Sequence, residues 1–408
     1  MRRLLFLLAP ALLLSEDLKS LLEFAKQNND LLVSSKFTQD AKAKDVDSKK
    51  SAYFPTIDIG GYYQSLDEKT PMLAGDMSSG FAKVGLDIYD GGKKSSLLDQ
   101  AKSEHKASEF DTNEIKRTLS LDITQNFYAL QSLNASLVAK EDAGKSLDEQ
   151  LSRIKKYFEA KLATKDDVDR LQAAYDTNVY EIESLKLQIL SNLKLLELKV
   201  GKKIAVLDNS SFKEVMQSEM AQSDAISSLM AKESAVISSA ESIASVYYPQ
   251  IKIEDSYNVY GYNRTDAAHP VGVENQNKIL LSANMRIFDY GAMSDAKQSV
   301  MLSAKALNAQ MVFKTKEQKM QYELASSRID TSKMKIKSAQ SALTSAKSAY
   351  TTINEKYKAG VVDYVVYLNA LTAQTSAHGM YETSLCELES AYASYYYYSG
   401  KNLEEFIK

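Results

Sequence analysis

Several residue types are scarce in this chain of 408 residues, and each scarcity excludes a class of protein. The single cysteine, Cys386, can form neither an internal disulfide nor a thiolate metal cluster. The three histidines, His105, His269 and His378, are too scattered along the sequence to suggest a metal site. Glycine-rich phosphate loops and hydrolase motifs are absent from the sequence. We therefore expect no enzyme activity, no catalytic or metal site and no cofactor.

The charge balance and the hydropathy narrow the class further. The formal net charge is −3, which argues against nucleic acid as a partner because such proteins carry a basic surface. No apolar run approaches the ~20 residues of a membrane-spanning helix. One short apolar run, Leu4 to Leu14, follows Arg2-Arg3 and is typical of a secretory signal. We assign residues 1–15 to a signal peptide; an ordinary buried N-terminal helix is the alternative.

Proline and glycine are also scarce, with 5 and 15 residues, and their positions reveal an internal repeat. Two motifs occur twice, as Tyr53-Phe54-Pro55 with Tyr247-Tyr248-Pro249 and as Asp90-Gly91-Gly92 with Asp289-Tyr290-Gly291. The first pair is 194 positions apart and the second is 199 positions apart. Self-similarity at a fixed spacing indicates one unit written twice. We place the first repeat at 16–208 and the second at 209–408.

Between these motifs the chain is almost free of helix breakers and is rich in good helix formers. Apolar residues recur there at helical spacing, as in Leu119, Ile123, Phe127, Leu130 and Leu137, which share one stripe. After an opening helix in each repeat, we expect long helices at 93–156 and 292–356, each roughly 96 Å long. Shorter helices at 166–200 and 364–398 would then return. Helices of this length indicate a coiled coil or a tube.

Two stretches of each repeat alternate between apolar and polar residues, which is typical of β-strands. The expected strands cover about 54–66, 80–90, 248–262 and 277–289. Ile279 and Leu281 alternate with polar neighbours in the last strand, whereas Asp255 interrupts the apolar row of the third. Each strand has the length of a tilted strand that crosses a bilayer, with one face toward lipid and one toward a lumen. A soluble hairpin with one wet face would show the same alternation.

The number of strands turns this pattern into a prediction of assembly. Four strands cannot close a barrel, and an open sheet edge in lipid would leave backbone N–H and C=O groups unsatisfied. Aromatic residues cluster near the strand ends, as they do at membrane interfaces. If the strands cross a membrane, several chains must therefore share one barrel.

In their order and duplication, these motifs resemble the outer-membrane efflux proteins, the TolC-like family, over nearly the full mature length. The segment from Leu22 to Asn29 is similar to the family's opening helix, and Ser51 to Ile57 is similar to the start of its first strand. The residues that match the strand starts and strand ends are Pro55, Pro249, Asp90, Gly92, Asp289 and Gly291. Tyr357 to Gly360 resembles the family's periplasmic tip turn, and Tyr157 to Thr164 its partner turn.

This resemblance implies a mainly α-helical protein with a transmembrane β part. It implies a homotrimer in which four strands per chain form one 12-stranded β-barrel, continued by a tube of long antiparallel helices. The chain would lie in the outer membrane, in contact with its lipid, and extend into the periplasm. There it would be the passive exit duct of a tripartite efflux or type I secretion system, with a periplasmic adaptor (membrane fusion) protein and an inner-membrane transporter as partners. An exported coiled-coil scaffold with soluble hairpins is the alternative.

The resemblance also assigns roles at the tips. Asp167 and Tyr357 match the acid and the tyrosine of the periplasmic gate, although a helix-start charge explains an acid at 167 equally well. The adaptor would contact the tip turns at Tyr157, Ala160, Thr164, Ala359 and Gly360.

The tips depart from the family pattern at four positions. Val362 stands where the best-known gate has arginine, and Val366 and Asn369 stand where acidic rings can line the constriction. Lys161 replaces the usual glycine of the first turn. Because a left-handed backbone would cost a lysine about 1 kcal/mol or more, we expect a differently shaped turn there.

Farther along, Tyr392 and Tyr395 to Tyr398 form a tyrosine-rich end, for which we favour core packing over ligand contact.

Overall fold

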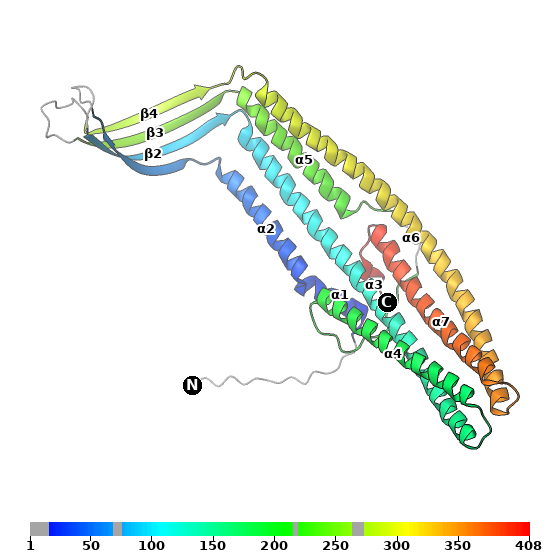
Figure 1. The fold of residues 1–408 in the computed structure, drawn as a ribbon. Coiled ribbons are helices and arrows are strands. Elements are labelled where there is room, and N and C mark those ends of the chain that lie inside the picture. Colours follow the sequence, from blue (N-terminus) through cyan, green and yellow to red (C-terminus); the bar gives the residue numbers. More distant parts are fainter. Residues whose placement is uncertain (1–15, 68–75, 215–218, 263–272) are drawn as a thin grey trace, which may run out of the picture. The chain divides into compact units, whose positions relative to one another are not determined.

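The computed structural model describes residues 16–67, 76–214, 219–262 and 273–408 (Figure 1). The expected signal peptide, 1–15, lies outside the described residues. In chain order the elements are α1 (Leu18–Asn28), α2 (Asp30–Ser51), β1 (Thr56–Ser65), β2 (Asp76–Asp90), α3 (Lys93–Glu159), α4 (Lys165–Val200), α5 (Asp224–Ala244), the 3-10 helix η1 (Ser245–Tyr247), β3 (Gln250–Tyr262), β4 (Asn275–Asn284), α6 (Ala292–Lys358), α7 (Tyr364–Tyr398) and the 3-10 helix η2 (Leu403–Phe406). The mainly helical fold with four strands is the one that the sequence predicts.

The long helices of the two repeats have equal lengths, and the return helices have nearly equal lengths. α3 and α6 each have 67 residues, and the return helices α4 and α7 have 36 and 35 residues. These helix bounds lie within three residues of the expected ones. Among the described helices, none is both long enough and apolar enough to span a membrane.

The four strands form one antiparallel sheet in the order β1-β2-β3-β4. The central pair, β2 with β3, joins the two repeats. β4 ends at Asn284, five residues before the expected end at 289. Its last residue pairs with Gln250, the first residue of β3, so the following residues have no neighbouring strand to bond. Pro249, just before β3, has no N–H to extend the ladder.

The register separates an apolar face of the sheet from a polar face. One cross-strand row on the apolar face contains Ile57, Val84, Asp255 and Ile279. The next row on the other face contains Asp58, Lys83, Ser256 and Lys278. The apolar side chains are open to solvent in the single chain, with Ile57 74% and Ile279 68% exposed. Successive residues point to opposite faces of a strand, which is why the alternation read from the sequence becomes this division.

The chain packs as two compact units, and each contains parts of both repeats. Among the described residues, the sheet unit lies within 36–111 and 225–314, and the tip unit lies within 16–35, 112–224 and 315–408. The sheet unit holds β1 to β4, and the tip unit holds both turns between a long helix and its return helix. The units therefore do not coincide with the sequence repeats, because strands and helices of one repeat pack against those of the other.

The main core of the tip unit gathers side chains from both ends of the chain. It includes Leu18, Leu21 and Leu22 of α1, Ile123, Phe127 and Tyr128 of α3, Leu196 and Val200 of α4, and Tyr395 and Tyr396 of α7. Four residues of the stripe read from the sequence, Leu119, Ile123, Phe127 and Leu130, lie in this core and are at most 7% exposed, whereas Leu137 is only half-buried and lies outside it. Tyr396 stacks on Phe406 at 3.9 Å between ring centroids. Core packing is thus confirmed for Tyr392, Tyr395 and Tyr396, each at most 5% exposed.

Candidate functional site at the helix tips

Both tip turns have the same backbone hydrogen bonds. After α3, the N–H of Leu162 donates to the Tyr157 carbonyl (2.7 Å) and that of Lys161 to the Phe158 carbonyl (2.9 Å). After α6, the N–H of Val361 donates to the Lys356 carbonyl (2.9 Å) and that of Gly360 to the Tyr357 carbonyl (3.0 Å). These are the paired bonds of a Schellman motif, which requires a left-handed residue just past the helix.

Lys161 therefore corrects one expectation. Its φ is +63°, close to the +74° of Gly360, so the first turn has the left-handed backbone that we expected it to avoid. The cost of that backbone for a lysine, about 1 kcal/mol, is offset by the two hydrogen bonds that close the turn. The Lys161 side chain is exposed, so the turn imposes no packing conflict on it.

The return helices begin with different caps. At α4, Thr164 and Asp167 form a capping box: the Thr164 hydroxyl oxygen accepts the N–H of Asp167 (3.2 Å), and Asp167 Oδ2 accepts the N–H of Thr164 (2.9 Å). At α7, Asp363 caps alone by accepting the N–H of Val366 (3.0 Å). The carboxylate of Asp167 is thus engaged at the start of its own helix, which is the alternative that the sequence left open for it.

An aromatic stack lies beside the turns. The ring of Tyr357 stacks on Tyr367 with centroids 4.9 Å apart, and Tyr350 approaches the same ring at 6.0 Å. Tyr367 is fully buried in a cluster with Leu147, Leu151 and Ile154 of α3, Leu171 of α4 and Leu371 of α7. Burial raises the pKa of the Tyr357 hydroxyl. This cluster packs the α3–α4 pair against the α6–α7 pair.

The residues expected to contact an adaptor all lie on the surface of the tips, namely Tyr157, Ala160, Thr164, Ala359 and Gly360. Two apolar residues that we did not single out are also strongly exposed there: Leu162 at 76% and Val361 at 71%. They occupy equivalent positions, each directly after the left-handed residue. Aligning the two turns of the repeat would have found this pair.

The strand-end motifs are helix caps. Asp90 accepts the N–H groups of Gly92 (3.1 Å) and Lys94 (2.7 Å) at the start of α3. Asp289 accepts those of Gly291 (3.2 Å) and Met293 (3.3 Å) at the start of α6. Both glycines have φ of +86°. The strand-start prolines, Pro55 and Pro249, each immediately precede a strand.

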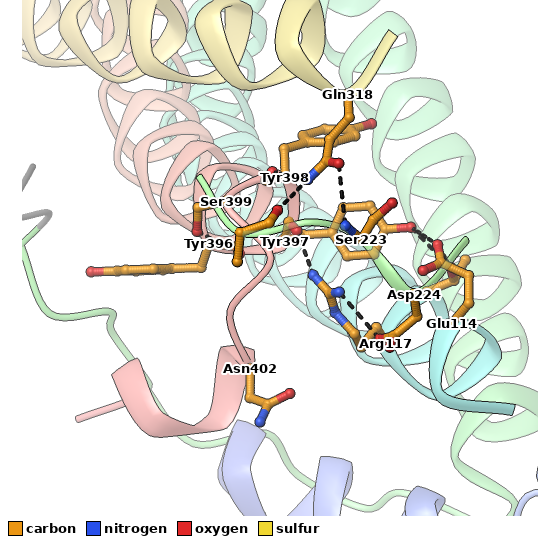
Figure 2. A network of polar contacts seen from close by, with 12 residues as sticks. Glu114, Arg117, Ser223, Asp224, Gln318, Tyr396, Tyr397, Tyr398, Ser399 and Asn402 are labelled. Carbon is orange, nitrogen blue, oxygen red and sulfur yellow. Dashed lines mark hydrogen bonds and ion pairs between the residues drawn. The ribbon is translucent and has the colours of Figure 1, made fainter. Parts of the chain in front are cut away.

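A polar network at the end of α7, also in the tip unit, escaped the sequence analysis (Figure 2). Arg117 Nη2 donates to the Tyr397 carbonyl (2.7 Å), Nη1 pairs with Asp224 (3.4 Å), and the guanidinium lies 5.4 Å from the Tyr397 ring. The Tyr397 hydroxyl donates to Glu114 (2.7 Å). Gln318 donates to the Ala221 and Tyr398 carbonyls. Helical periodicity locates apolar stripes, but it gives no signal for polar partners that lie this far apart in sequence.

Residues 21–202 match the family model of the outer membrane efflux protein. Over 289 residues the chain is 25% identical to the outer membrane protein TolC of Vibrio cholerae serotype O1, an alignment that covers 67% of this chain and 65% of that protein. By the match to the family model, residues 21–202 resemble the outer-membrane efflux protein family. The chain thus spans about two thirds of the length of the TolC protein that it matches.

Solved structures of several membrane proteins share the fold of this chain. A membrane protein from Pseudomonas aeruginosa matches with a TM-score of 0.81 at 17% identity, covering 94% of this chain and 93% of the other. The Campylobacter jejuni CmeC outer membrane channel matches with a TM-score of 0.84 at 14% identity, covering 95% and 86%. The outer membrane protein VceC of Vibrio cholerae gives 0.80 at 14% identity, covering 95% and 96%.

These findings confirm three predictions. The resemblance read from the sequence is correct, and the fold is that of long helices with a four-stranded antiparallel sheet. The expected location, in the outer membrane and extending into the periplasm, is that of the family. The family is one of transport proteins.

Proposed function

We propose that this chain is an outer-membrane efflux protein and forms a passive exit duct, in which three copies share one 12-stranded barrel and one helical tube. The observation that carries the proposal is the open sheet. β1 and β4 lie at its two edges, and within the described residues neither has a second neighbouring strand. In lipid such edges would leave backbone groups unsatisfied, and pairing β4 of one copy with β1 of the next satisfies them.

The two faces of the sheet support the same assembly. On the apolar face, Ile59 is 85% and Leu281 65% exposed in the single chain, and lipid is the environment that suits this surface. On the other face, Glu254 pairs with Lys83 (3.8 Å) and with Lys252 (3.2 Å). Charged pairs on one face and aliphatic side chains on the other are the pattern of a barrel around a water-filled lumen.

The tips support docking on a periplasmic adaptor, which would link the duct to an inner-membrane transporter. Leu162 and Val361 present two apolar side chains at equivalent points, beside the five predicted adaptor contacts. Exposed apolar residues rimmed by polar ones are typical of a protein interaction surface. Tyr357 and Asp167 remain the proposed gate residues, with Tyr357 positioned through its stack on Tyr367.

Native mass of the detergent-purified protein tests the assembly. We expect three times the mass of the mature chain, recovered from the outer-membrane fraction. A stable monomer, or recovery from the soluble periplasmic fraction, would instead favour the exported coiled-coil scaffold.

A matched pair of variants tests which face meets lipid. Ile59→Lys should abolish recovery of the trimer from the membrane, because a lysine on the lipid face costs about 2–4 kcal/mol near the bilayer centre. Asp58→Lys, one residue away on the polar face, should leave the trimer intact. Equal effects of both variants would contradict the proposed orientation.

A further inference from the structure

A positively charged cavity opens beside the polar network of Figure 2, in the tip unit. Its volume is about 270 Å³. The charged residues that line it are Lys26, Lys116, Arg117, Lys401, Asp224 and Glu404. They come from α1, α3, the start of α5 and the segment after α7. The cavity is thus built by segments that are far apart in sequence.

The acidic side chains of this cavity already have partners. Asp224 pairs with Arg117 (3.4 Å), and Glu404 pairs with Lys26 (2.7 Å) while it accepts the Ser120 hydroxyl (2.9 Å). Among the residues that the structure describes, neither Lys116 nor Lys401 has a carboxylate within 4 Å. Lys401 Nζ lies 5.7 Å from the centroid of the Phe406 ring. The lining therefore has an excess of two positive charges.

The wall of the cavity is held in place by its own contacts. The Arg117 side chain is only 11% exposed and is fixed by the Tyr397 carbonyl and ring. Tyr397 is fixed in turn by Glu114. In the described part of the chain, the buried Arg117 Nε has no hydrogen-bond acceptor. A buried N–H without a partner costs about 1–3 kcal/mol, so this wall retains donor capacity that the protein does not satisfy.

We propose that this cavity binds an oxyanion of the phosphate type, with Lys116 and Lys401 as its charged ligands. Two unpaired ammonium groups match the charge of a phosphate dianion, and lysine binds phosphate as a point charge. The amide of Asn113, which also lines the cavity, adds a neutral donor, and Asn402 can add its second amide N–H because the first donates to Glu405 (3.2 Å). The volume equals that of about nine water molecules at ~30 Å³ each, which accommodates a phosphate or a small phosphate ester. This site is independent of the duct, which needs no ligand at this position.

Thermal unfolding of the full detergent-purified protein tests the site. Sodium phosphate should raise the unfolding midpoint relative to sodium chloride at equal ionic strength, because a ligand that binds only the folded state stabilises it. The double variant Lys116→Gln/Lys401→Gln should raise the phosphate concentration that gives half of the full shift at least tenfold. A control that removes two exposed lysines of α6, Lys337→Gln/Lys347→Gln, should respond like the unchanged protein.

Three results would overturn the proposal: no shift with phosphate, an equal shift with acetate, or equal phosphate responses of the double variant and its control. If phosphate binds, a second measurement with polyphosphate at the same total phosphate concentration tests which kind of ligand the site takes. A larger rise of the unfolding midpoint than with phosphate indicates a ligand carried on a polymer, and an equal rise indicates a small solute. Native mass is measured on the same samples. An unchanged trimer without phosphate binding would overturn the anion site alone, and a monomer would overturn the duct alone.

Discussion

The two tip turns have the same backbone but different side chains. Each closes with the same pair of hydrogen bonds and the same left-handed residue, yet that residue is Lys161 in one and Gly360 in the other. The first return helix begins with a two-residue capping box, and the second begins with Asp363 alone. The hydrogen bonds that end one helix and start the next therefore fix the turn, and each repeat satisfies them with its own residues.

The turns that follow β2 and β4 show when a left-handed position accepts a residue other than glycine. Gly91 and Tyr290 are equivalent and both left-handed, with φ of +72° and +57°. A Cβ at Gly91 would lie 2.3 Å from the Ser245 carbonyl oxygen, whereas Tyr290 is 91% exposed. At Gly360, as at Gly92, a Cβ would meet no atom within 4 Å. Space around the backbone decides whether glycine is required, and at the tips it is not.

The largest loss of stability should come from removing the side chain of Tyr367, at which the α3–α4 pair packs against the α6–α7 pair. Tyr367→Ala leaves a cavity in a fully buried cluster and should lower the free energy of unfolding by about 3–5 kcal/mol. Guanidinium unfolding of the purified protein, followed by circular dichroism, measures this loss.

Tyr367→Phe is the matched control. The Tyr367 hydroxyl is buried and has no partner of good hydrogen-bond geometry among the described residues. Removing it should therefore leave stability unchanged or raise it slightly. A loss from Tyr367→Phe as large as that from Tyr367→Ala would show that the hydroxyl, and not the ring stack, holds the tips together.

A smaller effect should follow from exchanging the two left-handed residues. Gly360→Lys should destabilise the protein by about 1 kcal/mol, because open space around Gly360 leaves only the backbone penalty. Lys161→Gly should relieve that penalty, in part cancelled by the added freedom of the unfolded chain. Opposite signs in the same unfolding assay would confirm that the turns are equivalent; destabilisation by both would mean that the Lys161 side chain contributes a contact of its own.

The sequence predicted the helices, the strands and the buried stripe, because periodicity and duplication reveal them. It did not predict features that depend on local hydrogen bonds or on polar partners far apart in the chain. The stripe through Ile123 and Phe127 is buried as predicted, because period 3.6 places those residues on one face. The early end of β4 could not be read, since it depends on where β3 begins. The left-handed Lys161 contradicted a residue preference that the turn's hydrogen bonds override. Arg117 and Tyr397 meet across 280 positions, for which a single sequence carries no signal.

The smallest effect that we predict is a change of conductance at the proposed gate. It also tests whether Asp167 acts as more than a helix cap. Asp167 holds a capping box, so a change there mixes loss of charge with loss of the cap. Asp167→Asn removes the charge but keeps an oxygen that can accept the N–H of Thr164, whereas Thr164→Ala removes the capping hydroxyl and keeps the charge. In planar bilayers we expect Tyr357→Ala to raise conductance, Asp167→Asn to raise it less, and Thr164→Ala to leave it unchanged. Equal conductance changes for Asp167→Asn and Thr164→Ala would assign Asp167 to the helix start alone and leave Tyr357 as the gate residue of this chain.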